Sequence, residues 1–297
     1  MAAASAGEAA SRPEAAARPA VERTAVERLS VNQWTVRSWG VKELADGCGR
    51  HGIGAVGLWR EPVAEFGLAR SAKVVKDAGL RVSSLCRSGF FGRPGWLDDN
   101  RAAIDETAEL GAACLVLVVG GLHDNSKKLG AARAHMADAV AELAQYAEER
   151  QVRLALEPMH PMYCADRGVL STLRQALDLA AGYKPPTVGV MVDTFHLWWD
   201  PEVGDQIQRA GREDRIAGYQ VSDFLMPLPA DVLLGRAMMG DGVIDFEPLC
   251  QAVTAAGYKG DIEVEIFNAD VWAADPDDVL ARLKDTYREL IANHFSK

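Results

Sequence analysis

The chain has 297 residues, of which 48% are hydrophobic and 25% are charged, so it is long enough and apolar enough for one large domain with a sizeable core. Its formal net charge of −10 excludes a protein that neutralises nucleic acid with an excess of lysine and arginine, and no apolar run approaches the about 20 residues that span a bilayer. Five scattered cysteines without a CxxC pair are typical of a reduced compartment rather than a disulfide framework, so we expect a cytoplasmic protein.

The first segment, residues 1–27, is rich in alanine, glutamate, arginine and proline. It lacks the apolar stretch of a secretory signal, and its glutamates are unlike a transit peptide. Its composition offers too little apolar surface to offset the entropy lost on ordering. This segment is therefore predicted to be a flexible tail in front of a domain at residues 28–297.

After the tail, short apolar segments alternate with longer amphipathic segments. The predicted strands are 29–36, 53–59, 81–86, 113–119, 152–157, 187–193, 216–222 and 261–266. The predicted helices, which follow these strands in turn, are 41–50, 63–78, 97–110, 130–149, 169–181, 204–210, 246–256 and 276–294. Nearly continuous apolar strands indicate a parallel sheet with both faces covered. Eight such units, with no glycine-rich dinucleotide fingerprint after the first strand, predict a single-domain (β/α)₈ TIM barrel rather than an open sheet.

Carboxylates or their amides end several of the predicted strands. Glu157, Asp193 and Glu265 lie at the ends of the fifth, sixth and eighth strands, and Gln220 lies near the end of the seventh. The C-terminal ends of barrel strands meet at one mouth, so these acids would repel one another unless a cation lies among them. A hydrogen-bonded core acid could explain one case, but three converging acids favour a divalent metal, with Gln220 as a neutral fourth ligand. Oxygen ligands favour Mn²⁺, with Mg²⁺ or Co²⁺ as alternatives, over Zn²⁺.

From about Leu29 to its end, the chain resembles the sugar phosphate isomerase/epimerase superfamily, which has a xylose-isomerase-like barrel and includes ketose 3-epimerases and inosose dehydratases. The resemblance is carried by Glu157-Pro-Met-His160-Pro, Asp193-Thr-Phe-His196, Gln220-Val-Ser-Asp223, Gly240-Asp-Gly-Val-Ile-Asp245-Phe246 and Glu263-Val-Glu265. It implies metal ligation by Glu157, Asp193 and Glu265. The histidine that the family has on its seventh strand is replaced by Gln220 in this chain.

The resemblance also implies roles in chemistry. In the epimerases of this family, two metal-bound glutamates exchange protons with opposite faces of the substrate carbon, and these match Glu157 and Glu265. A substrate-binding histidine matches His196, and a substrate-binding arginine in the loop after the seventh strand matches Arg236. A metal-bound hydroxyketone has an acidified C–H bond, which a neighbouring carboxylate can deprotonate.

Several further residues near strand ends have two interpretations. His160 either lines the substrate pocket or caps the loop after the fifth strand. Asp223 either holds a residue that binds substrate or metal in place through a hydrogen bond, or ends the strand as a turn residue. Four tryptophans would form either an aromatic pocket wall or core and subunit contacts. They are Trp34, Trp59, Trp198 and Trp199.

These observations favour an isomerase or epimerase that acts on a ketose, keto-sugar or polyol. A lyase of the same superfamily, such as an inosose-type dehydratase or a keto-glycoside-cleaving subunit, shares the first proton abstraction and is the alternative. DNA repair of the endonuclease IV type is excluded, because the ends of the second and third strands carry no histidine for a trinuclear zinc site. A non-catalytic barrel that serves as a partner subunit, and a homo-oligomer, both stay open. A phosphorylated substrate is disfavoured, since no glycine-rich anion nest occurs.

Overall fold

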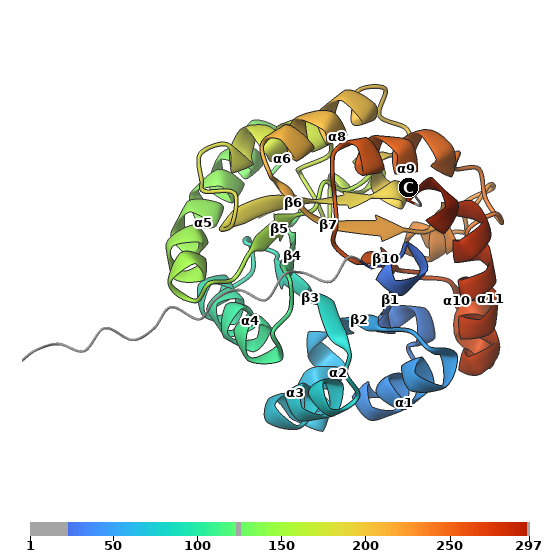
Figure 1. Ribbon diagram of the computed structural model, residues 1–297. Coiled ribbons are helices and arrows are strands. Elements are labelled where there is room, and N and C mark those ends of the chain that lie inside the picture. The colour runs from blue at the N-terminus through green and yellow to red at the C-terminus, as the bar shows by residue number, and fades with distance from the viewer. Residues whose placement is uncertain (1–22, 123–125, 296–297) are drawn as a thin grey trace, which may run out of the picture.

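The computed structural model describes residues 23–122 and 126–295, and in these residues eight parallel strands close into a barrel (Figure 1). The eight strands are β1 Leu29–Asn32, β2 Ala55–Trp59, β3 Arg81–Gly89, β4 Leu115–Val118, β5 Leu154–Leu156, β6 Val188–Asp193, β7 Ile216–Val221 and β10 Ile262–Val264. The barrel closes where β1 pairs with β10, with Leu29 opposite Ile262. The predicted TIM barrel is confirmed.

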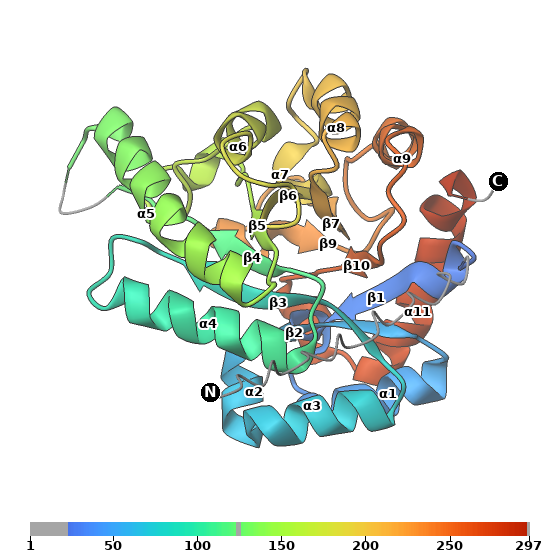
Figure 2. The ribbon, with the colours of Figure 1, turned by 60° about the vertical axis from the view of Figure 1, so that its left-hand side comes forward.

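Helices form a ring around the strands, as the view in Figure 1 shows. They are α1 Val41–His51, α2 Arg60–Phe66, α3 Leu68–Asp77, α4 Trp96–Leu110, α5 Leu129–Glu149, α6 Leu173–Ala180, α7 Thr194–Leu197, α8 Val203–Arg212, α9 Phe246–Ala255, α10 Ala269–Ala273 and α11 Pro276–Leu290. In Figure 2, α4 and α5 lie side by side along the barrel wall, and the two helices contact each other. No helix in the described part of the chain is both long enough and apolar enough to cross a membrane.

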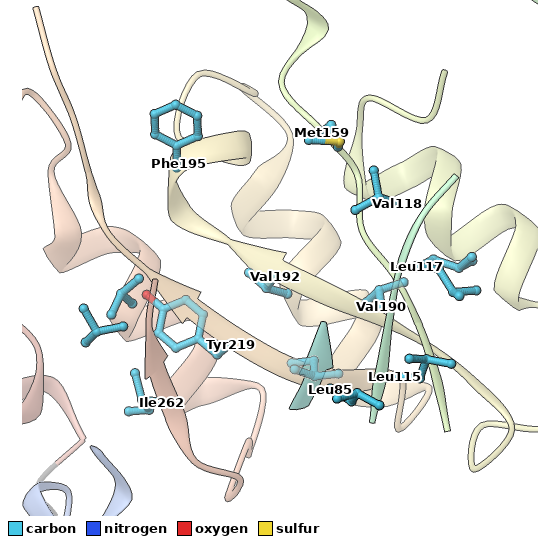
Figure 3. Close-up of a cluster of buried hydrophobic side chains, with 14 of the residues drawn as sticks. Leu85, Leu115, Leu117, Val118, Met159, Val190, Val192, Phe195, Tyr219 and Ile262 are labelled. Atoms are coloured by element: carbon cyan, nitrogen blue, oxygen red, sulfur yellow. The ribbon is translucent and has the colours of Figure 1, made fainter. Parts of the chain in front are cut away.

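The core has two layers, because successive side chains of a strand point to opposite faces. Leu115 and Leu117 of β4 point outward and pack against the helices, together with Val190 of β6 (Figure 3). Val116 of β4 and Met191 of β6 belong to a smaller apolar cluster. This alternation continues at the ends of the strands, where the inward positions become polar.

Several predicted elements differ from the structure in their boundaries. The predicted helix 63–78 is two helices, α2 and α3, which meet at Gly67, where φ is +98°. The predicted helix 169–181 begins only at Leu173, after a cap in which Thr172 accepts a hydrogen bond from the backbone of Gln175. The short helices α7 and α10, which lie in loops at the C-terminal ends of strands, were not predicted.

Residues 23–27, the last part of the predicted tail, belong to the described part of the chain. Residues 1–22 lie outside the described part of the chain, but the segment that follows packs on the barrel. Ala25 is buried, and its carbonyl accepts a hydrogen bond of 2.7 Å from the hydroxyl of Tyr287 on α11. Arg23 forms an ion pair with Asp261. Residues before position 28 therefore contribute contacts to the barrel.

Candidate active site

The polar strand ends surround a cavity of about 520 Å³. Glu157 follows β5 and Glu265 follows β10, and both line the cavity together with His196 and Arg236. Asp193, the last residue of β6, is buried beside them. A larger cavity, of about 1120 Å³, opens toward the N-terminal ends of the strands. We place the site in the smaller one, because catalysis in TIM barrels is found at the C-terminal face.

Arg236 supplies a positive charge among the buried acids. Its Nη2 atom lies 2.7 Å from Oδ2 of Asp193 and 3.2 Å from Oε2 of Glu265. Its Nη1 atom donates to the hydroxyl of Ser222 at 3.0 Å, and the guanidinium carbon lies 4.6 Å from the ring centroid of Phe195. The positive charge of Arg236 thus balances part of the negative charge of the carboxylates at the mouth of the barrel.

A short hairpin brings Arg236 to this position. The strands β8 Asp223–Phe224 and β9 Arg236–Ala237 pair antiparallel, with Phe224 opposite Arg236. Oδ2 of Asp223 accepts the backbone N–H groups of Gly240 and Gly242, each at 2.9 Å, and this carboxylate is buried. A Cβ on Gly242 would lie 2.4 Å from Oδ1 of Asp223, so the turn needs glycine there. Among the described residues Asp223 is not part of the cavity lining, and it acts as the anchor of this turn.

Burial sets the charge preferences of the three acids. Burial, together with the neighbouring Glu265 and Asp193, raises the pKa of Glu157 well above its ordinary value. Burial also raises the pKa of Glu265 to about 8, although Arg236 acts in the opposite direction. Burial opposes ionisation of Asp193 too, but the charge and hydrogen bond of Arg236, together with the backbone N–H of Phe195, outweigh it, and the pKa of Asp193 is lowered. Asp193 is therefore the fixed anion, and the two glutamates favour a proton when no other cation is near.

His196 is a neutral hydrogen-bond donor. Burial, with a contribution from Arg236, lowers its pKa to about 3. Its Nδ1 accepts the backbone N–H of His160 at 3.2 Å, so the proton of the neutral ring lies on Nε2. The contact of 3.3 Å between Nε2 and Arg236 Nη2 then joins two donors. This geometry suits donation to a substrate oxygen better than ligation of a metal.

His160 holds the loop after β5. Its Nδ1 accepts the backbone N–H of Met162 at 3.3 Å, and its ring packs against Trp199 and Phe224. It is absent from the cavity lining in the described residues, and it reaches the site through the backbone bond to His196. Of its two interpretations, the structure therefore supports the cap.

Two groups of side chains offer clustered ligand atoms that a divalent ion could use. Ligand atoms of Glu157, Asp193 and His196 lie within 4.8 Å of one another, and those of Cys86, Glu263 and Glu265 form a second such group. Gln220 Nε2 donates to Glu263 at 2.9 Å. Gln220 Oε1 is buried and has no hydrogen-bond partner among the described residues. Gln220 pairs with Asp193 across β6 and β7, although in the described part of the chain it lines the larger cavity and not the smaller one. A buried, unpartnered neutral oxygen on the strand beside Asp193 fits a hard cation that prefers oxygen ligands.

Aromatic side chains form one wall of the cavity. Trp34, Trp59, Phe267 and Trp272 all line it, and Trp34 stacks on Phe267 with ring centroids 5.6 Å apart. Arg37 also lines the cavity, and its guanidinium carbon lies 4.3 Å from the Trp272 ring centroid. The pocket-wall interpretation therefore holds for Trp34 and Trp59. Phe267 and Trp272 were not predicted, because Phe267 lies in the loop after the eighth strand and Trp272 lies in the short helix α10, which has no repeating pattern.

Comparison with known families matches residues 44–290 to the Xylose isomerase-like TIM barrel. The chain belongs to this family. Among curated proteins, this xylose isomerase-like barrel is 27% identical over 246 residues to a ketose 3-epimerase of Arthrobacter globiformis, which covers 79% of this chain and 75% of that one. It is 24% identical over 229 residues to L-ribulose-5-phosphate 3-epimerase UlaE of Escherichia coli O1:K1 / APEC, covering 73% and 75%. Its curated relatives are thus sugar epimerases and isomerases.

Solved structures agree with this assignment. The protein SMc04130 of Sinorhizobium meliloti 1021 superposes with a TM-score of 0.87 and 45% identity, over 90% of this chain and 99% of that one. The IolI protein with a bound zinc atom superposes with a TM-score of 0.76 and 20% identity, over 91% and 99% of the two chains. The second match shows the likeness of the fold, and it places a metal in that relative.

Proposed function

We propose that this protein is a divalent-metal-dependent epimerase or isomerase that acts on a ketose, keto-sugar or polyol. The observation that carries this proposal is the pair Glu157 and Glu265. The two carboxyl groups line one cavity from strands that are separated by β6 and β7. Two carboxylates that reach one bound substrate from different sides can remove a proton from a carbon on one face and return one on the other.

The residues that would hold the ion are Glu157, Asp193, Gln220 and Glu265. We expect Mn²⁺, with Mg²⁺ or Co²⁺ as alternatives, because every donor in this set is an oxygen. When bound, such an ion polarises a substrate oxygen and stabilises the negative charge that develops beside it.

The protein's own side chains transfer the protons, bind the substrate and exclude water. One of the two glutamates removes the proton from the substrate carbon on one face, and the other delivers a proton to the opposite face. His196, with its proton on Nε2, and Arg236 bind and orient substrate oxygens. The aromatic wall around Trp34 excludes water from the reacting carbon.

The test is a reaction in D₂O with Mn²⁺ and a panel of free and phosphorylated ketoses, followed by NMR. A product of unchanged formula with deuterium on the reacting carbon is the expected result. Loss of water or of an aglycone would instead support the lyase, whose first step is the same. Isomerisation without solvent deuterium would contradict proton transfer and indicate a hydride shift.

Substitution of either glutamate provides the matching mutational test. Glu157→Gln and Glu265→Gln should each lower kcat by about 10²–10⁴-fold, the usual contribution of a positioned acid or base. The conservative change Glu289→Gln on α11 lies outside the cavity lining and should leave kcat unchanged. If both cavity variants keep the wild-type kcat, the assignment of the acid–base pair is wrong.

A further inference from the structure

A fourth buried carboxylate, that of Glu263, lies on the N-terminal side of the three acids at the strand ends. Glu263 is on β10, two residues before Glu265, and only 2% of its surface is exposed. Its carboxylate accepts four side-chain hydrogen bonds. The donors are Asn32 Nδ2 and Gln220 Nε2 to Oε1, at 2.7 and 2.9 Å, and Ser83 Oγ and Ser84 Oγ to Oε2, at 2.6 and 2.8 Å.

Space for this carboxylate is built into the barrel. On β2, Gly57 faces Glu263, and a Cβ at that position would lie 2.5 Å from the carboxyl carbon. Any larger residue at position 57 would displace the carboxylate from its four donors. The arrangement therefore depends on residues from β1, β2, β3, β7 and β10.

The orientations of the Asn32 and Gln220 side-chain amides follow from their contact with Oε1 of Glu263. Oε1 can only accept, so both amides must turn their NH₂ groups toward it, and their oxygens face other groups. The oxygen of Asn32 accepts the indole N–H of Trp59 at 2.8 Å and the backbone N–H of Trp34 at 3.0 Å. The oxygen of Gln220 is buried and finds no partner among the described residues. One amide oxygen is thus used to hold the cavity wall, and the other is left free.

We propose that Glu263 is a positioning residue, which fixes the Gln220 amide so that its oxygen, and not its nitrogen, is available to a cation at the carboxylate site. Through Asn32 it also holds the indole of Trp59 in the cavity wall. This inference rests on the proposed function, since it takes Gln220 as a metal ligand. Without this contact the Gln220 amide could rotate and present either its oxygen or its NH₂ group to the cation. The contact with Glu263 explains how glutamine can act as a ligand there. The flipped amide would set two acceptor oxygens against each other at Glu263.

The test measures metal binding rather than turnover. Glu263→Gln offers the Gln220 amide either a donor or an acceptor, so the amide is no longer held in one orientation. We expect the Kd for Mn²⁺, measured by isothermal titration of metal-free protein, to rise by about 10–100-fold, the usual effect of losing a group that orients a ligand. Ser84→Ala removes one donor from the other carboxylate oxygen and leaves both amides in place, so its Kd should stay within about twofold of wild type.

A double-mutant cycle separates positioning from general damage. Gln220→Leu removes the free oxygen, and in that background Glu263→Gln should weaken Mn²⁺ binding no further, because Glu263 acts through Gln220. Additive losses, or an unchanged Kd in Glu263→Gln, would overturn the proposal. If Glu263→Gln does not fold, Glu263→Asp keeps the accepting carboxylate but shortens its reach, and the same loss of affinity is expected.

Failure of this inference is distinguishable from failure of the proposed function. Asp193→Asn and Glu157→Gln should weaken Mn²⁺ binding in any case if the metal site is correct. Loss of binding in those variants, with wild-type binding in Glu263→Gln, rejects only the positioning role. Wild-type binding in all of them rejects the metal site itself.

Discussion

Arg236 changes how the charges of the site are balanced. Its guanidinium contacts Asp193 and Glu265, and all three side chains are buried. Removal of one partner from a buried ion pair is costly, because the other charge stays in a medium of low polarity. A bound divalent ion would share the same carboxylates. The stability of the metal-free protein should therefore depend on Arg236 more than that of the loaded protein.

This dependence is measurable with Arg236→Met, which keeps most of the side-chain volume. In metal-free protein we expect the free energy of unfolding to fall by about 3–5 kcal/mol. Mn²⁺ should then raise the Tm of the variant more than that of wild type. Arg282→Met is the control, since its ion pair with Asp241 is exposed and is worth at most about 1 kcal/mol. Equal unfolding free energies for Arg236→Met and wild type would show that Arg236 does not compensate the acids.

The acids themselves are predictable from sequence, but their partners are not. Glu157, Asp193 and Glu265 end apolar strands, and the strand period places them at one mouth. Arg236 lies 43 residues from Asp193 along the chain, and its contact depends on a hairpin with no periodic pattern. Glu263 was visible in the Glu-Val-Glu motif, yet its contacts come from four other strands. Pairings between distant elements leave no local signal.

At the scale of elements, the loop after β7 decides where Arg236 lies. Asp223 accepts the backbone N–H groups of Gly240, Gly242 and Ile244, and so ties the end of the loop to its beginning. The loop also returns through β9, which carries Arg236. The position of the guanidinium therefore depends on a carboxylate that touches neither cavity nor substrate.

Asp223→Asn tests this link. The amide NH₂ group would face backbone donors, so we expect the free energy of unfolding to fall by about 1.5–3 kcal/mol, the scale of hydrogen bonds to a charged group. The KM should rise as well, because Arg236 loses its anchor. Asp245→Ala removes the N-cap of α9 and should cost about 1 kcal/mol without any change in KM. A KM unchanged in Asp223→Asn, despite lower stability, would disconnect the turn from substrate binding.

Element boundaries were less predictable than element types. The helical pattern runs on through Gly67, and only the backbone conformation at that glycine divides α2 from α3. Val169 and Leu170 are buried in the loop before α6, so their apolar character resembled a helix face. Buried loop residues follow the packing around them rather than a period, and a sequence pattern assigns them to the nearest helix.

At the scale of the whole molecule, the barrel was predictable because eight strand–helix units repeat independently of the loops. The edge of the domain was not. Ala25 is buried, and its carbonyl accepts a hydrogen bond from Tyr287, a residue 262 positions away. No repeating pattern in this part of the sequence marks where packing begins.

Two truncations place this edge. A chain that starts at Arg23 should keep the wild-type Tm and activity, since the removed residues carry little apolar surface. A chain that starts at Arg28 loses the carbonyl that the buried Tyr287 hydroxyl binds and the ion pair between Arg23 and Asp261. A buried hydroxyl without a partner costs about 1–3 kcal/mol, which lowers the Tm of a domain of this size by several degrees. Tyr287→Phe in the shorter chain is the control and should restore part of that loss, because it removes the unpaired hydroxyl. An equal Tm for the two truncated chains would mean that the domain begins at residue 28, as the composition alone predicts.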